Sequence, residues 1–181
     1  MLFRSLPLSH SYEHTAGQFF PISIGAQIYY AEGVEQLLTN LAEARPTIMT
    51  AVPRLYEIMH QRIRRGVEKQ GGLKARLFAL AEKLGRKRYS DPRSLGPLER
   101  IEDMLVERLV RDKVRARFGG RLKAMVSGGA ALNEDIGIFF TALGLNILQG
   151  YGQTEASPVI DRKSTRLNSS HSQQSRMPSS A

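Results

Sequence analysis

Short apolar segments alternate with helical segments along this chain, and the later ones end in glycine-bearing turns. Residues 46–52 (PTIMTAV) are rich in β-branched side chains, which is typical of a buried strand. Residues 121–129 (RLKAMVSGG) indicate a strand and a turn, and residues 145–152 (LNILQGYG) a strand that enters a loop. Strands that alternate with helices favour parallel pairing through right-handed crossovers. The sequence therefore predicts an α/β fold, a parallel doubly wound sheet with flanking helices.

The segments between the strands have the hydrophobic periodicity of helices. Pro53 suits the first turn of one helix, and Asn133 is a natural N-cap for another, which Gly144 would end. Residues 13–26 are mostly apolar and predict a buried helix that Pro21 interrupts. The remaining predicted helices are residues 33–45, 72–90 and 97–118, and residues 26–31 are strand-like.

The positive charge of the chain is concentrated in the predicted helices. The net charge is +9, and residues 54–123 alone hold 20 Lys and Arg against 9 Asp and Glu. A solvated helical insertion over about residues 60–118, with its leucines packed inward, accounts for this pattern. The alternative is that residues 64–88, with the leucine stripe Leu73, Leu77, Leu80 and Leu84, are a basic amphipathic module that binds an anionic membrane surface. Nucleic acid is not expected as a partner, because aromatic side chains are not interleaved with the basic ones.

The composition excludes several other classes of site. The chain has no Cys, so disulfides, thiolate nucleophiles and Cys-ligated metals are absent. The four His residues lack the spacing of a metal site. No apolar run reaches the length of a membrane span.

The sequence changes character at residue 161. Residues 161–181 have almost no apolar side chains, which predicts a disordered tail. DRKSTRLNSSH and SRMPSSA within it resemble the in-frame translation of two blocks of a common short-read sequencing adapter, separated by the length of a sample index. Residues 161–181 are therefore expected to be a non-native tail, and residues 1–160 one partial domain.

Two glycine-bearing loops are expected at the carboxyl ends of neighbouring strands, where ligands bind in such sheets. They are SGGAAL (127–132) and GYGQTE (150–155). Glycines let a flat or phosphorylated ligand approach the backbone, although they also occur in ordinary tight turns. In the second loop Tyr151 offers an aromatic face, Thr154 a hydroxyl for a phosphate oxygen, and Glu155 a carboxylate suited to Mg²⁺.

Four blocks of this sequence resemble the adenylate-forming enzymes. QGYGQTEA (149–156) resembles their aromatic-Gly-X-Thr-Glu signature, with VSGGAAL (126–132) upstream at the spacing that the family has. LPLSHSYEHTAG (6–17) resembles the Pro-Leu-X-His stretch of the family, and TAVPRLYE (50–57) resembles the Val-Pro-Arg segment of the long-chain fatty acid–CoA ligases in particular. SYEHT and VPRLYE together favour the long-chain branch. The resemblance implies a partial N-terminal, AMP-binding domain of such a ligase. Another acid-activating adenylate-forming enzyme remains the alternative within the family.

The resemblance implies that a fatty acid reacts with ATP to an acyl-adenylate and pyrophosphate, and that coenzyme A then displaces AMP. Because an anion attacks an anion, the protein must neutralise charge and align the reactants. Thr154 and Glu155 would be the catalytic residues, Thr154 on phosphate oxygens and Glu155 on Mg²⁺. His10 would lie beside the carboxylate end of the acyl pocket, with a hydrogen-bonded loop histidine as the alternative. Arg54 is expected to pair with Glu57.

The nucleotide would lie against the two loops. The residues expected to bind ATP or AMP are Gly128, Gly129, Ala130, Gln149, Gly150, Tyr151, Gly152 and Thr154. The phosphate loop that the family carries upstream of His10 and the Asp, Arg and C-terminal Lys that it carries downstream have no counterpart here. We therefore expect this chain alone to be inactive, and Met1 to be an internal codon. The parent enzyme is expected to be cytoplasmic, with peripheral contact at the inner face of the membrane as an open alternative.

Overall fold

The computed structural model describes residues 2–4, 13–151 and 161–164 and contains one six-stranded sheet. The strand order is β2-β1-β3-β4-β5-β6, in which the first five strands are parallel and β6 is antiparallel to β5. The strands are β1 Leu2–Arg4, β2 Ile28–Tyr30, β3 Ile48–Ala51, β4 Ala124–Ser127, β5 Ile147–Tyr151 and β6 Asp161–Ser164. The predicted parallel sheet is confirmed.

The helices follow the predicted segments closely. They are η1 Glu13–Phe19, α1 Phe20–Ser23, α2 Leu37–Ala44, α3 Pro53–Gln70, α4 Gly72–Ser90, α5 Pro97–Val106, η2 Glu107–Arg111, α6 Asp112–Arg117 and α7 Glu134–Ala142. η1 and η2 are π-helical. Because α5, η2 and α6 follow one another without a break, they form the single helix predicted over residues 97–118. Gly144, with φ of 82°, lies just beyond the end of α7 as expected.

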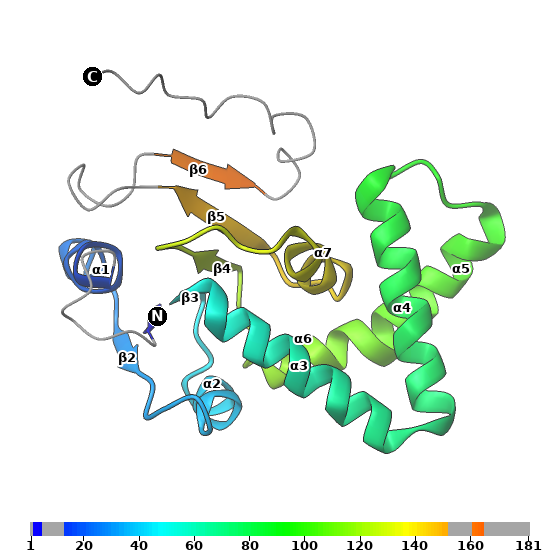
Figure 1. The fold of residues 1–181 in the computed structure, drawn as a ribbon, viewed down its shortest axis with the longest axis horizontal. Coiled ribbons are helices and arrows are strands. Elements are labelled where there is room, and N and C mark those ends of the chain that lie inside the picture. The colour runs from blue at the N-terminus through cyan, green and yellow to red at the C-terminus, as the bar shows by residue number, and fades with distance from the viewer. Residues whose placement is uncertain (1, 5–12, 152–160, 165–181) are drawn as a thin grey trace, which may run out of the picture.

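The strand order reverses direction between β1 and β3, which makes the sheet doubly wound. The chain first moves outward from β1 to β2 and then crosses back to β3, β4 and β5. Right-handed crossovers in opposite directions place their helices on opposite faces. Accordingly η1 and α1 lie on one face of the sheet, while α2, α3 and α7 lie on the other (Figure 1).

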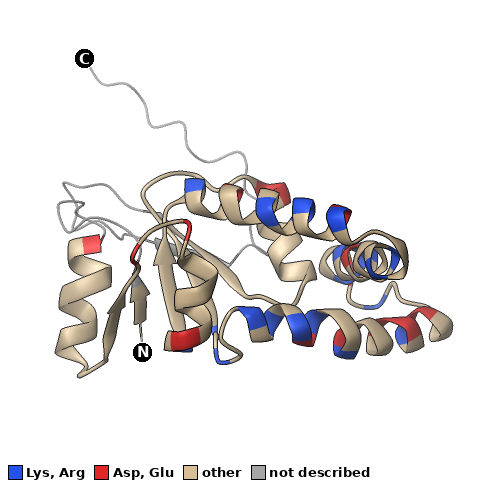
Figure 2. Cartoon of the chain, turned by 90° about the horizontal axis from the view of Figure 1, so that it is seen from below, with Lys and Arg blue, Asp and Glu red and all other residues tan. Residues whose placement is uncertain are grey.

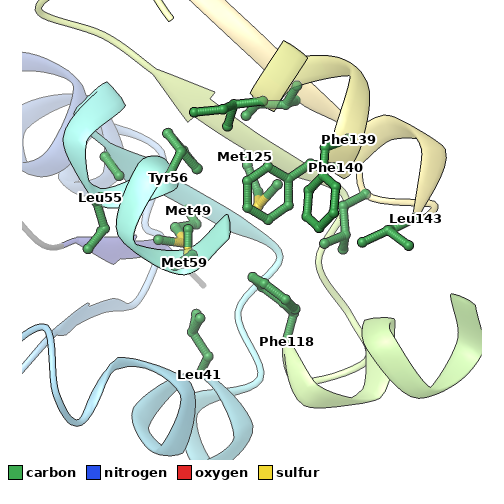
Figure 3. Packing of buried hydrophobic residues seen from close by; sticks show 14 of the residues in the cluster. Leu41, Met49, Leu55, Tyr56, Met59, Phe118, Met125, Phe139, Phe140 and Leu143 are labelled. Atoms are coloured by element: carbon green, nitrogen blue, oxygen red, sulfur yellow. The ribbon is translucent and has the colours of Figure 1, made fainter. Parts of the chain in front are cut away.

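The main core lies between the sheet and the helices of this second face. Met49 and Met125 of the central strands are fully buried, and they meet Phe139 and Phe140 of α7 and Tyr56 of α3 (Figure 3). The rings of Phe139 and Phe140 pack edge to face, with centroids 5.3 Å apart.

The helices of the predicted insertion, from α3 to α6, extend from this core away from the sheet (Figure 1). Of its leucine stripe, Leu84 is buried, Leu77 and Leu80 are half-buried against the core, and Leu73 is exposed. The stripe therefore packs inward except at its first turn. Lys and Arg are distributed along these helices, interspersed with Asp and Glu (Figure 2).

Two expectations differ from the structure. The segment at residues 13–26 is helical as far as Ser23 but only partly buried. Glu13, Gly17 and Pro21 are buried, whereas Phe20, Ile22 and Ile24 are 55–61% exposed and are left largely uncovered by the described residues.

The second difference is in the tail. Residues 161–164, expected to be disordered, form β6, which pairs with β5 from Tyr151↔Asp161 to Leu148↔Ser164. A strand edge offers free N–H and C=O groups, so pairing with it requires no apolar side chain. Residues 165–181 lie outside the described part, and the boundary of the native sequence at residue 160 stays a prediction.

Candidate functional site

The first predicted loop leaves the carboxyl end of β4 in a conformation that glycine permits. The amide of Gly128 donates to the carbonyl of Ala51, 3.1 Å away, so the loop begins as a continuation of the ladder between β3 and β4. Gly129 follows with φ of 84°, in the left-handed region that an L side chain rarely adopts. Gly128 is buried, whereas Gly129 and Ala130 are exposed. The turn therefore presents backbone, without side-chain bulk, at this edge.

The second loop leaves the adjacent strand at the same edge. Ser127 of β4 is in register with Gln149 of β5, and both strands run in the same direction. Gln149 and Gly150 are half-buried, and Tyr151 is the last residue of β5. The structure thus brings Gly128, Gly129 and Ala130 next to Gln149, Gly150 and the backbone of Tyr151. The other predicted site residues, His10, Gly152, Thr154 and Glu155, lie outside the described residues.

Helix α7 starts directly after the first loop. Asn133 caps it as predicted, because its Oδ1 accepts from the amide of Asp135 at 2.9 Å. The carboxylate of Asp135 also pairs with Arg86 of α4 at 3.2 Å. These contacts occupy part of the positive end of α7. A ligand at this edge of the sheet would therefore meet the backbone of the glycine turn rather than the N–H groups of the helix terminus.

Four polar groups near the carboxyl ends of β3 and β4 were not found by sequence reasoning. The hydroxyl of Ser127 is fully buried and has no hydrogen-bond partner among the described residues. Tyr56 donates its hydroxyl proton to the carbonyl of Val126 at 3.1 Å, which ties α3 to the end of β4. On the other face of the sheet the hydroxyl of Thr50 donates to the buried carboxylate of Glu13, 3.4 Å away. All four lie inside the motifs quoted above, which was the signal available: Ser127 in VSGGAAL, Thr50 and Tyr56 in TAVPRLYE, and Glu13 in LPLSHSYEHTAG.

A polar group buried without a partner is costly, and this applies to the hydroxyl of Ser127. A ligand bound at the glycine turn would bring polar atoms to the edge of the sheet at which Ser127 ends β4. The described residues do not supply a metal site by themselves, since no three His, Asp or Glu side chains converge within them. Mg²⁺ is typically held by one or two carboxylates together with substrate phosphates, and Glu155 fits that donor set.

The expected pair at the start of α3 is present. Arg54 Nη1 lies 2.8 Å from Glu57 Oε2 on the exposed side of the helix. Pro53 occupies the first position of α3, with Val52 extended before it. Arg54 therefore has the structural pairing that the sequence suggested.

The chain matches the AMP-binding enzyme family over residues 2–180. It is 36% identical over 157 residues to the peroxisomal long chain acyl-CoA synthetase 6 of Arabidopsis thaliana, covering 86% of this chain and 21% of the relative. It is 31% identical over 157 residues to the human long-chain-fatty-acid–CoA ligase ACSBG2, covering 84% of this chain and 23% of the relative. The chain thus spans about a fifth of the length of these curated relatives.

A solved structure has a similar fold. The A domain of carboxylic acid reductase from Segniliparus rugosus, in complex with AMP and a co-purified carboxylic acid, aligns with a TM-score of 0.63. The alignment covers 89% of this chain and 21% of that one, and the two are 22% identical. This likeness establishes a shared fold, and the family match covers nearly the whole chain. The chain belongs to the AMP-binding enzyme family.

Proposed function

We propose that this chain is a segment of an ATP-dependent long-chain fatty acid–CoA ligase. The parent enzyme converts a long-chain fatty acid, ATP and coenzyme A to acyl-CoA, AMP and pyrophosphate through an acyl-adenylate. The observation that carries the proposal is the pair of loops that leave β4 and β5 side by side, one turning at Gly129 and the other containing the Gly-Gln-Thr-Glu sequence. The long-chain synthetases among the relatives favour this branch over another acid-activating enzyme of the family.

In this proposal the first loop holds the nucleotide through its backbone. Gly129, which has no side chain and adopts a positive φ, lets the adenine approach the turn at Gly128–Ala130. Gln149 and Gly150 line the adjacent strand, and Tyr151 stacks on the base. The hydroxyl of Thr154 bonds phosphate oxygens, and His10 lies beside the acyl carboxylate.

Glu155 would hold Mg²⁺, which when bound supplies positive charge against the phosphates. The chemical need is clear, because a carboxylate attacks an already anionic phosphate. Cations and N–H donors that are already in place around the reacting phosphate supply the main part of the catalysis of such a reaction.

Replacement of Glu155 tests the proposal in a full-length enzyme that carries this segment. Glu155→Ala should lower ATP-dependent acyl-CoA formation by at least roughly a hundredfold, since a preorganised charge of the transition state is lost. The matched control is Glu68→Ala, an exposed carboxylate near the end of α3, which should leave the rate unchanged. An unchanged rate in Glu155→Ala would contradict the proposal. A panel of carboxylic acids of increasing length separates the long-chain branch from the other acid-activating enzymes.

A peripheral membrane contact is a second candidate function, supported by helix α5 rather than α4. Leu98, Ile101, Met104 and Leu105 of α5 are 54–78% exposed, and Arg100 and Arg108 lie in the same stretch. Apolar side chains beside cations suit the surface of an anionic bilayer, here the inner face of the membrane of a cytoplasmic enzyme. None of the described helices is both long and apolar enough to cross a bilayer.

Liposome sedimentation tests this candidate. Wild-type chain should bind vesicles that contain phosphatidylserine, and Leu98→Ser/Leu105→Ser should lose that binding. The matched control is Leu73→Ser on α4, also exposed, which should bind as the wild type does. If the wild type fails to sediment with anionic vesicles, the membrane contact is wrong.

A further inference from the structure

A cavity of about 510 Å³ lies between the helices on the face of the sheet that carries α3. Residues of α2, α3, α4, η2 and α6 line it. This volume falls within the usual range for small-molecule sites, which is about 300–1,000 Å³. The cavity is thus large enough for a ligand.

The cavity is separate from the glycine loops. Helix α3 starts at the edge where those loops leave the sheet, because Pro53 follows the carboxyl end of β3. The cavity residues Gly66, Val67 and Gln70 belong to the other end of α3. With a rise of about 1.5 Å per residue, Gly66 lies roughly 20 Å along the helix from Pro53. A ligand here would not occupy the proposed nucleotide site.

The walls of the cavity are apolar. Phe78, Val110 and Phe118 are buried at its base, while Ile63, Val67 and Leu77 are only half-buried. These half-buried side chains leave apolar surface facing the open space between the helices. Covering such surface with an aliphatic chain is favourable, in proportion to the area removed from water.

The charged residues that line the cavity are all positive. The described residues that line it include Arg62, Lys74, Lys113 and Arg117 but no Asp or Glu. Arg62 is engaged elsewhere, because it donates to the carbonyl of Val34 at 3.0 Å and pairs with Glu35. Lys74, Lys113 and Arg117 are exposed and have no ion-pair partner among the described residues. Three cations are therefore available to an anionic group on the ligand.

We propose that this cavity is a second ligand site that binds a single-chain anionic amphiphile. The aliphatic chain lies between α3, α4 and α6, and the anionic head lies at Lys74, Lys113 and Arg117. A free fatty acid and a fatty acyl thioester of coenzyme A share this chemistry. A bilayer does not fit it, because the apolar surface is recessed between helices rather than displayed on one.

The binding test uses this chain and a fluorescent fatty acid whose emission rises in an apolar environment. Dodecanoate and dodecanoyl-CoA compete for the probe below their micellar concentrations, and the tighter competitor identifies the natural source. Two further competitors test the charge: neutral dodecanol and cationic dodecyltrimethylammonium. Both should displace the probe at least about tenfold more weakly than dodecanoate. Equal displacement by dodecanol would overturn the assignment of an anionic ligand.

Gly66 provides a variant that fills the cavity from its wall. A Cβ at this position meets no atom within 4 Å, so a larger side chain can extend into the open space. Gly66→Leu should weaken dodecanoate binding by at least about tenfold, whereas Gly66→Ala, which adds a single methyl group, should bind within about twofold of the wild type. Unchanged binding by a folded Gly66→Leu chain would overturn the site.

The head group has an independent test. Lys113→Gln/Arg117→Gln removes two exposed cations, so the fold is not at risk. The affinity for dodecanoate should fall by roughly fivefold, and the affinity for dodecanol should not change. Equal affinity of this variant for dodecanoate would overturn the placement of the anion.

A second copy of this chain is the other occupant that the cavity could have, and sedimentation velocity tests for it. If the wild type is a dimer and Gly66→Leu dissociates that dimer, a second copy fills the cavity and the proposal is overturned.

Discussion

At the scale of single residues, Arg111 is a buried cation that links helices α4, α5 and α7. Its side chain is fully buried, with Nε donating to the carbonyl of Ala142 at 2.8 Å and Nη2 to that of Ala81 at 3.1 Å. Nη1 lies 2.7 Å from Asp103 Oδ1 and 2.9 Å from Glu107 Oε2. Arg111→Met should lower the free energy of unfolding by about 3–5 kcal/mol, because the buried carbonyls of Ala81 and Ala142 lose their charged donor and the buried carboxylate of Asp103 keeps only Arg88. Urea unfolding measures the change.

Arg115, one helical turn beyond Arg111, is the matched control. It pairs with Asp112 at 2.6 Å and with Glu107, but its side chain is one-third exposed. Arg115→Gln should therefore cost no more than about 1 kcal/mol, as for exposed ion pairs. Equal losses for the two variants would contradict the role given to burial.

His60 makes stability depend on pH. Burial and the nearby Arg64 guanidinium lower its pKa from 6.5, and this outweighs Glu82 and Asp135, which raise it. Arg64 Nε donates to His60 Nε2 at 2.8 Å, which requires the neutral ring. Because the unfolded chain binds this proton more readily, the free energy of unfolding should fall as pH drops below 6.5. His60→Gln should flatten that part of a stability–pH curve. The same slope in both proteins would exclude His60 as its source.

At the scale of helices, replacing a glycine by alanine should have opposite effects on stability at two positions, Gly85 and Gly66. A Cβ on Gly85 of α4 would lie 2.5 Å from the carbonyl oxygen and 2.6 Å from the Cα of Ala142, so α4 and α7 would have to separate. Gly85→Ala should lower the thermal midpoint, although alanine favours helix. Gly66→Ala has open space at its Cβ and should raise stability by about 0.5–1 kcal/mol. Calorimetry of both variants checks the contrast, which fails if their midpoints move in the same direction.

The sequence predicted the helices and strands well because their periodicity and end signals are local. Pro53 and Asn133 begin their helices as expected, and the parallel sheet follows from the alternation of elements. The adjacency of the loops at Ser127 and Gln149 followed from the same rule. The buried pairing of Arg111 could not be predicted, because it depends on how α4, α5 and α7 meet. For the same reason the cavity near Gly66 has no signal in the sequence.

At the scale of the whole molecule, the two faces of the sheet are unequally covered. Helices α2, α3 and α7 bury one face, while only η1 and α1 lie on the other among the described elements (Figure 1). This explains why Phe20, Ile22 and Ile24 are exposed although the segment at residues 13–26 is helical and mostly apolar. Amphipathic periodicity predicts that a helix has an apolar face, but it does not say whether another part of the chain covers that face.

The uncovered face of η1 and α1 should make this chain self-associate. Ile22 and Ile24 are 58% and 61% exposed, and Phe19 and Phe20, just before them in the sequence, are both 55% exposed. Large exposed apolar patches promote association. Ile22→Ser/Ile24→Ser should lower the weight-average mass in sedimentation velocity and change the free energy of unfolding by no more than about 0.5 kcal/mol. Leu73→Ser, an exposed leucine on α4 away from this patch, should leave the association unchanged. If the double variant associates as strongly as the wild type, another surface drives association, and the exposed apolar side chains of α1 are tolerated in water.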